Sequence, residues 1–148
     1  MSNRILALDV ATHTGWATEG ASGVWNLTPK RDESAGVRLL RLKAKIREII
    51  SLDEIDLVVF ERSQGQHQNA VIVQSELHGV VKLYCEENNI QYVAYSPSEI
   101  KKHATGKGNA KKSDMVKAAQ EKYGLKSSDD NEADAVHIYH YAKSIFNA

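Results

Sequence analysis

The stretch Arg4-Ile-Leu-Ala-Leu-Asp9 is a continuous apolar run that ends in a carboxylate. A run of this kind is typical of a strand buried on both faces, at the centre of a sheet. A second run, Ile55-Asp-Leu-Val-Val-Phe-Glu61, has the same form and also ends in an acid. The carboxyl ends of adjacent strands meet at one edge of an open α/β sheet, so we expect Asp9 and Glu61 to converge there.

The segments around these two strands predict one α/β domain over residues 1–148. Alternating and apolar runs predict further strands, and helical spacing of apolar residues predicts helices that cover the sheet. The expected order is β-β-β-α-β-α-β-α-α, a mixed five-stranded sheet with helices on both faces. The expected strands are 4–10, 15–18, 23–27, 55–61 and 91–95, and the expected helices are 32–52, 68–88, 112–123 and a last one capped by Asp129 or Asp130. Ser96 and Pro97 predict a helical turn after the fifth strand.

Composition narrows the class of protein. The chain has 148 residues, of which 42% are apolar and 26% charged, as in an ordinary globular domain. It contains no apolar stretch long enough for a membrane span, and the first strand begins almost at Met1, so we expect a cytoplasmic protein. The single Cys85 excludes an intrachain disulfide and a cysteine metal cluster.

The charges are balanced in number but uneven along the chain. The formal net charge is zero, yet the segment from Lys101 to Lys117 carries six lysines and the single acid Asp114. The segment Asp129–Asp134 is acidic instead. A basic strip beside an acidic cluster suits phosphate attraction next to a metal site. Two solvated faces of opposite charge are an equally good interpretation of charge alone.

A third acid, Asp134, lies one turn into the last predicted helix. Phosphodiester hydrolysis commonly uses oxygen ligands that hold Mg²⁺ or Mn²⁺, often two ions about 3.5–4 Å apart. An apolar strand that ends in an acid is also an ordinary way for a chain to leave the core. On the helix, Asp130 and Asn131 are spaced to share a face with Asp134, although Asp130 is also a candidate N-cap. Glu132 is expected to point away into solvent.

Four motifs resemble those of RuvC-type Holliday junction resolvases, which have an RNase H-like fold. The first strand with Thr14-Gly15-Trp16-Ala17 resembles the first motif of this family, and Val58-Val-Phe-Glu61 resembles its second acidic strand. The segment from Ser96 to Lys112 resembles the family's lysine-glycine segment, and Ala133-Asp-Ala-Val136 its final motif. The motifs occur in the family's order and extend from residue 4 to residue 136.

The resemblance implies specific roles for residues in the site. Asp9, Glu61 and Asp134 match three of four acidic metal ligands; the fourth falls on Asn131, which leaves Asp130 or Asn131 as the remaining ligand. Lys101 and Lys112 match two functional lysines, and Lys112 would stabilise charge at the scissile phosphate. Lys102, Lys107 and Lys111 are either solvated or generic contacts to backbone phosphates, and Arg62 could also contact DNA. The expected DNA-binding residues are therefore Lys101, Lys102, Lys107, Lys111 and Arg62. The run from Arg62 to Asn69 lacks the aromatic residue that stacks on junction bases in cellular members, so the chain looks more like a phage-type member.

These observations predict a metal-dependent, structure-specific DNA endonuclease. We expect it to cleave Holliday junctions or other branched DNA to 5′-phosphate and 3′-hydroxyl ends with two Mg²⁺ or Mn²⁺ ions. Symmetric cleavage implies a twofold homodimer, for which the helix 68–88 is the candidate interface. One alternative is an RNA-processing nuclease of the same fold. Another is a catalytically silent module that binds branched DNA, if Asn131 marks a decayed site.

Overall fold

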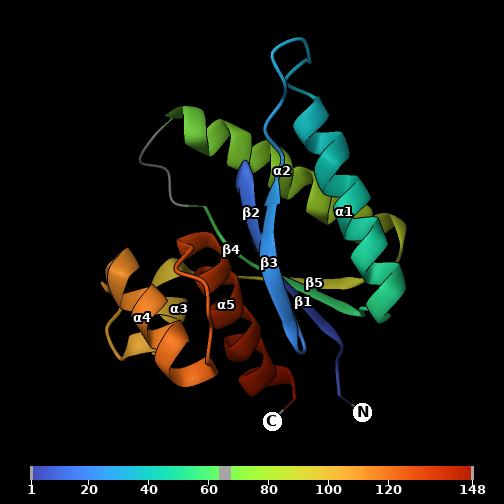
Figure 1. Cartoon of the computed structure of the whole chain (residues 1–148). Coiled ribbons are helices and arrows are strands. Elements are labelled where there is room, and N and C mark those ends of the chain that lie inside the picture. Colours follow the sequence, from blue (N-terminus) through green and yellow to red (C-terminus); the bar gives the residue numbers. More distant parts are fainter. Residues whose placement is uncertain (1, 64–67, 148) are drawn as a thin grey trace.

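The protein is built around a mixed five-stranded sheet, as the sequence predicts (Figure 1). The computed structural model describes residues 2–63 and 68–147. The strands lie in the order β3-β2-β1-β4-β5, with β1 parallel to β4, β4 parallel to β5, and β2 antiparallel to both β1 and β3. Their bounds are β1 (Ile5–Asp9), β2 (His13–Thr18), β3 (Ala21–Asn26), β4 (Leu57–Glu61) and β5 (Gln91–Tyr95).

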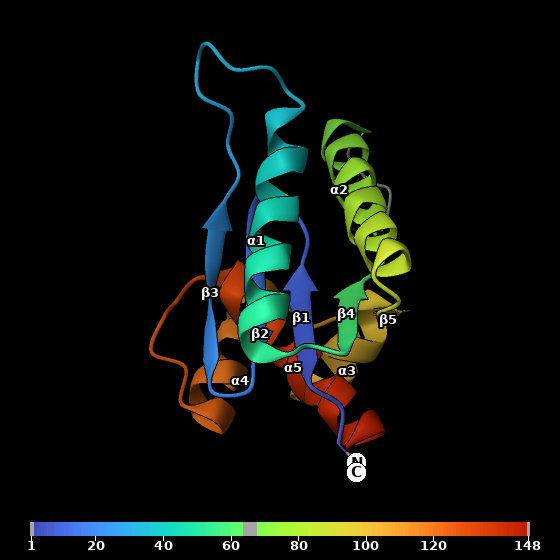
Figure 2. The same ribbon diagram turned by 90° about the vertical axis from the view of Figure 1, so that its right-hand side faces the viewer.

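Helices cover both faces of the sheet (Figure 2). Helices α1 (Val37–Asp53) and α2 (Gln68–Glu87) lie on one face, and α3 (Pro97–Thr105), α4 (Lys112–Tyr123) and α5 (Asp130–Phe146) lie on the other. Successive side chains of a strand point to opposite faces. In β1, Leu6 and Leu8 therefore enter the core under α1 and α2, while Ile5 and Ala7 enter the core under α5. This is why the first strand is apolar at every position before Asp9.

Three predicted boundaries are wrong. The helix predicted from residue 32 begins at Val37, because the preceding residues form a loop held by side-chain hydrogen bonds. The strand predicted from residue 15 begins at His13, since His13 pairs with Asn26 in the sheet. The single turn expected after Ser96 is the whole helix α3, stabilised by a capping box between Ser96 and Glu99.

Gly15 allows the start of α5 to approach the sheet. It pairs with Asp9 across the β1–β2 ladder. A Cβ atom at Gly15 would lie 1.9 Å from the backbone oxygen of Asn131, a distance that the chain could not accommodate without moving α5. The missing side chain thus sets how closely the first turn of α5 approaches the end of β1. Within residues 2–63 and 68–147, the structure has no helix that is long and apolar enough to cross a membrane.

Candidate active site

Three acids predicted from the sequence meet at the carboxyl edge of the sheet. Asp9 is the last residue of β1 and Glu61 is the last residue of β4, the parallel neighbour of β1. Asp134 lies in the second turn of α5, whose N-terminal end packs against β2 at Gly15. The parallel pairing of β1 and β4, together with the close approach of α5, therefore brings residues far apart in the sequence to one edge.

Burial and neighbouring charges raise the proton affinity of these acids. Burial raises the pKa of Asp9 well above its ordinary value of 3.8, and the charges of Asp134, Glu61 and Asp130 raise it further. Burial, Glu61 and Asp130 raise the pKa of Asp134 to about 7. Burial also raises the pKa of Glu61. Since each desolvated carboxylate favours the neutral form when another is close, this group has the electrostatic character of a site that needs a cation.

Asp130 belongs to this group, and Asn131 lies to one side of it. Asp129, not Asp130, caps α5: its Oδ1 accepts hydrogen bonds from the backbone N–H groups of Asn131 at 2.8 Å and Glu132 at 3.1 Å. Asp130 is thus free of the cap, and its charge raises the pKa of both Asp9 and Asp134. Asn131 lines a separate hollow beside Ala11–His13 and the start of α2. We call Asp9, Glu61, Asp130 and Asp134 the acid cluster.

Glu132 does not point into solvent as expected. Its Oε2 accepts a hydrogen bond of 2.6 Å from the Ser22 hydroxyl on β3, and its side chain is half-buried. This contact ties the first turn of α5 to the edge strand of the sheet. Together with the close approach at Gly15, it fixes the end of the helix that carries Asp130 and Asp134.

A cavity of about 420 Å³ opens beside the acid cluster. It is lined by acidic, basic and apolar side chains from β4, α2, α3, α4 and α5, among them Glu61, Arg62, Gln74, Lys101, Lys112 and Asp134. A larger hollow of about 500 Å³ lies between the β2–β3 hairpin and the α4–α5 connection, and no member of the acid cluster lines it. The smaller cavity is therefore the candidate substrate space.

Two of the predicted lysines face the acids. The Lys101 charge lowers the pKa of both Glu61 and Asp134, and the Lys112 charge lowers that of Asp9 and Asp134, against the dominant effect of burial. Lys112 Nζ lies 3.6 Å from Asp130 Oδ2. The Lys112 side chain is nevertheless 85% exposed, so most of it remains accessible to a ligand.

The remaining predicted basic residues divide into two sets. Arg62 lines the cavity and its Nη2 lies 3.8 Å from Glu99 Oε1. Lys102, Lys107 and Lys111 are exposed but lie outside the cavity, and Lys107 lines a different hollow on α3 and α4. Part of the stretch that lacks an aromatic residue, residues 64–67, lies outside the described residues.

Sequence reasoning missed two polar side chains of α2 behind the site. Gln74 Nε2 donates a 3.0 Å hydrogen bond to the carbonyl oxygen of Val10, the residue after Asp9, and Gln74 also lines the cavity. His78, one turn later, is buried against the Phe60 ring at 5.0 Å. Burial lowers the pKa of His78 to about 4, although a hydrogen bond to the Glu61 backbone opposes the shift. Both residues interrupt the buried apolar face of α2, which is the signal that could have found them.

The acid cluster does not form a complete set of protein ligands around one ion. Among the described side chains, no three of the His, Cys, Asp or Glu types are arranged to hold one ion by themselves. Mg²⁺ is usually bound by one or two carboxylates, several waters and substrate phosphates. An open group of oxygen donors beside two lysines therefore fits a hard cation shared with a phosphate ligand.

Comparison with known sequences identifies a family. The family model described as "Crossover junction endodeoxyribonuclease RuvC" matches residues 19–140. Proteins of that name from Caldicellulosiruptor saccharolyticus and Gloeobacter violaceus are 32% and 31% identical over 69% and 68% of this chain. One from Brachyspira hyodysenteriae is 37% identical over 50% of it. These matches span 63%, 60% and 46% of the three relatives, so the chain spans less than two thirds of their length.

Solved structures share the fold. Thermus thermophilus RuvC in complex with a Holliday junction substrate has a TM-score of 0.76, with 22% identity and 97% of each chain covered. The yeast mitochondrial Holliday junction resolvase has a TM-score of 0.63, with 14% identity, covering 93% of this chain and 76% of that one. The RNase H-like fold implied by the sequence resemblance is thereby confirmed.

Proposed function

The chain belongs to the family of RuvC crossover junction endodeoxyribonucleases, and on that premise we propose that it is a metal-dependent endonuclease that cuts branched DNA. The observation that carries this proposal is the acid cluster. Burial and neighbouring acids raise the pKa of Asp9 and Asp134 beside a cavity that two lysines also line. Clustered acids of this kind destabilise a fold unless a cation is added, which is what a catalytic metal site supplies.

The oxygen donors of the acid cluster fit Mg²⁺ or Mn²⁺, and the cluster would hold two such ions. All four members of the acid cluster offer carboxylate oxygens, the ligands that these hard cations prefer. Asp9, Glu61 and Asp134 would hold the ions, with Asp130 as the fourth ligand in preference to Asn131, which faces another hollow. Bound divalent ions activate water and stabilise the leaving oxygen of a phosphodiester.

The chain's own residues orient the substrate around that site. The Lys112 side chain is exposed enough to meet a phosphate, and its ion pair with Asp130 keeps its ammonium group beside the acids. It would stabilise negative charge on the scissile phosphate, which is worth about 10²–10³ in rate for a well-placed donor. Lys101 and Arg62 line the same cavity, where both would bind backbone phosphates. Lys102, Lys107 and Lys111 would contact DNA farther from the cut.

The products would be a 5′-phosphate and a 3′-hydroxyl, with a four-way junction as the favoured substrate. Two symmetric cuts require two sites, so we propose a twofold homodimer of single nuclease domains. Helix α2 is the candidate interface, and Ile72 and Leu83 on it are exposed apolar residues. With DNA as its substrate, the protein would act in the cytoplasm of a bacterium or of a phage-infected cell.

The test is cleavage of end-labelled four-way, three-way and linear DNA with Mg²⁺, Mn²⁺ or a chelator. We expect nicks with either metal, none with chelator, and fastest cutting of the four-way substrate. Lys112→Ala should slow cutting by about 10²-fold while junction binding stays within about threefold.

The same assay decides between the proposal and the two alternatives. Cleavage of an RNA hybrid in preference to branched DNA would assign the fold to RNA processing. Junction binding that survives chelation, with no nicked product under any metal, would make the chain a silent binding module. Full activity of Asp9→Asn with Mg²⁺ would contradict the mechanism itself.

A further inference from the structure

A second basic region lies outside the lysine strip of α3 and α4. Residues 30–47 carry seven basic side chains and only the acids Asp32 and Glu33. The basic residues are Lys30, Arg31, Arg38, Arg41, Lys43, Lys45 and Arg47. The excess of basic over acidic residues here equals that of the strip from Lys101 to Lys117. Both segments stand out because the whole chain has zero net charge.

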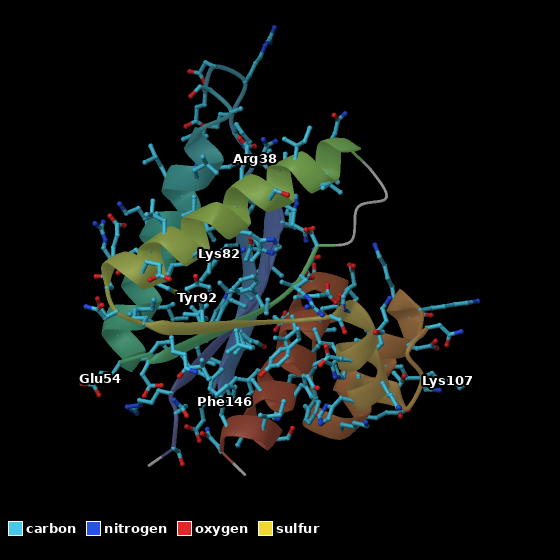
Figure 3. All side chains as sticks on the ribbon, turned by 180° about the vertical axis from the view of Figure 1, so that it is seen from behind. Arg38, Glu54, Lys82, Tyr92, Lys107 and Phe146 are labelled. Atoms are coloured by element: carbon cyan, nitrogen blue, oxygen red, sulfur yellow. The ribbon has the colours of Figure 1, made fainter. Side chains whose placement is uncertain are left out.

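The loop at the N-terminal end of this region projects from the same edge of the sheet as the acid cluster. The loop 27–36 between β3 and α1 extends beyond the carboxyl end of β1 and forms the top of the molecule in Figure 1. Figure 3 shows Arg38 near this end and Lys107 lower in the view, at the right beside α3 and α4. The two basic regions therefore flank the edge where Asp9 and Glu61 end their strands.

Side-chain hydrogen bonds hold the loop in one shape. Arg41 Nη2 lies 2.7 Å from both carboxylate oxygens of Glu33, and Arg41 Nη1 donates to the Thr28 carbonyl oxygen at 2.9 Å. Glu33 Oε1 also accepts the backbone N–H of Lys30 at 2.6 Å. At the base of the loop, Asn26 Oδ1 accepts both the N–H and the hydroxyl of Thr28, at 3.0 and 2.6 Å.

The same contacts decide which charges are available. Arg41 pairs with Glu33 in a half-buried ion pair, so these two charges satisfy each other. Lys30 and Arg31 at the tip remain exposed. A loop that is fixed before binding loses little conformational freedom when it meets a ligand, which favours affinity. Exposed cations on a rigid loop beside a nuclease-type site suit the phosphate backbone of nucleic acid.

We propose that the loop 27–36 is a preorganised second contact for the DNA backbone, in which Lys30 and Arg31 bind phosphates of one arm of the substrate. The inference rests on the proposed function, since it takes branched DNA as the ligand. Glu33 is a positioning residue in it: it holds the backbone of Lys30 and does not touch DNA. Neither Lys30 nor Arg31 belongs to the acid cluster or lines its cavity.

The sharpest test compares two neighbouring carboxylates in the loop. Glu33→Ala and Asp32→Ala each add one unit of positive charge, but only Glu33 holds the loop. Binding is measured with a labelled four-way junction and a linear duplex in chelator at several salt concentrations. We expect Glu33→Ala to weaken junction binding by about fivefold despite its added charge, while Asp32→Ala leaves it unchanged or tightens it. Equal tightening by both would overturn the preorganised loop.

A second comparison tests the cations. Lys30→Ala with Arg31→Ala should weaken junction binding about tenfold and reduce the slope of log K against log salt by about 1.8, the value for two phosphate contacts. Lys43→Ala with Lys45→Ala removes the same charge from exposed positions on α1 and should change binding by less than about twofold.

The outcomes separate this inference from the proposed function. Equal losses from the two double variants would refute a specific loop contact, even if the wild-type protein binds and cuts junctions normally. A wild-type protein that binds neither DNA would refute both. Thermal unfolding of each variant checks that the loop changes leave the fold intact.

Discussion

The carboxylates of this protein fall into two environments with opposite electrostatics. Glu33 and Glu99 have donors arranged around them: Arg41 lowers the pKa of Glu33, and Ser96, Tyr141 and Arg62 lower that of Glu99. The acid cluster has the reverse arrangement, because burial and neighbouring acids raise the pKa of Asp9 and Asp134. Lys101 and Lys112 oppose that rise without outweighing it.

This difference separates structural acids from candidate functional ones. An acid that serves the fold is given its hydrogen bonds by the chain, as Glu33 and Glu99 are. Buried acids without such partners reduce stability, so their retention at one edge of the sheet points to an added ligand. The comparison also explains why the sheet edge, and not the surroundings of Glu33 or Glu99, is the candidate metal site.

The largest effect is expected when the acid cluster loses a charge. Asp134→Asn should lower Mg²⁺-dependent junction cleavage by about 10³-fold, since metal stabilisation of a transition state is worth several kcal/mol. The matched control is Asp56→Asn at the opposite end of β4, where Asp56 accepts a hydrogen bond from the Arg4 backbone. Similar single-turnover rates for these two variants would remove the distinction between the two environments.

The next largest effect is expected when the close approach of α5 to β2 at Gly15 is blocked. Gly15→Ala should lower the free energy of unfolding by about 1–3 kcal/mol, because the new methyl group collides with the Asn131 backbone. It should also reduce cleavage, as the collision displaces the helix that carries Asp130 and Asp134. Gly79→Ala, in open space on α2, is expected to be neutral or to stabilise by up to about 1 kcal/mol. Urea unfolding measures the stability of both variants. A Gly15→Ala protein as stable as wild type would contradict the close packing of α5 against Gly15.

A smaller effect follows from the pKa of Asp134. This acid titrates near 3.8 when unfolded and near 7 when folded, so the unfolded chain releases its proton first as the pH rises. The metal-free protein therefore loses stability between about pH 4 and pH 7, with no further loss from this group above pH 7. Asp134→Asn removes this loss of folding stability. Each unit by which the pKa is raised corresponds to about 1.4 kcal/mol, or roughly 3–6 °C in Tm.

Differential scanning calorimetry in chelator checks the sign. The gain in Tm of Asp134→Asn over wild type should be larger at pH 8 than at pH 5. A gain that shrinks as the pH rises would mean that the carboxylate is stabilised in its charged form, as Glu33 is.

The smallest effect is expected behind the site. Gln74→Leu removes the hydrogen bond to Val10 next to Asp9, which is worth about 0.5–1.5 kcal/mol. We expect Mn²⁺ affinity to fall by up to about tenfold. Gln120→Leu removes a comparable amide contact, to the Ser127 carbonyl, and should leave Mn²⁺ affinity unchanged. Equal Mn²⁺ titration curves for both variants would show that Gln74 has only a structural role.

The sequence was informative where local pattern and tertiary structure coincide. The apolar runs that end in Asp9 and Glu61 predicted two central strands and the edge where the acids meet, because a strand buried on both faces has no polar positions. The start of α5 was harder. Asp129 and Asp130 are both good caps, and only the backbone geometry shows that Asp129 accepts the hydrogen bonds and leaves Asp130 with the acid cluster.

Other features depended on contacts between distant segments. The loop before α1 replaces a predicted helical turn because Glu33 binds Arg41 and the Lys30 backbone, a choice that helix propensity does not record. Gln74 looked like one polar residue among many on α2 until the Val10 carbonyl was placed beside it. The basic residues of the segment 30–47 were visible in the sequence, but the projection of the loop 27–36 from the same edge of the sheet as the acid cluster was not.

The central claim is that the acid cluster holds divalent cations, and proton release on metal binding tests it most directly. Mn²⁺ is titrated calorimetrically into the metal-free protein in buffers of different ionisation enthalpy, at pH 7 and pH 9. Because Asp134 is about half protonated near pH 7, its contribution to proton release on binding should be larger at pH 7 than at pH 9. Asp9→Asn should abolish binding and Asp56→Asn should not. Binding that is absent in the wild type, or unchanged in Asp9→Asn, would contradict the account.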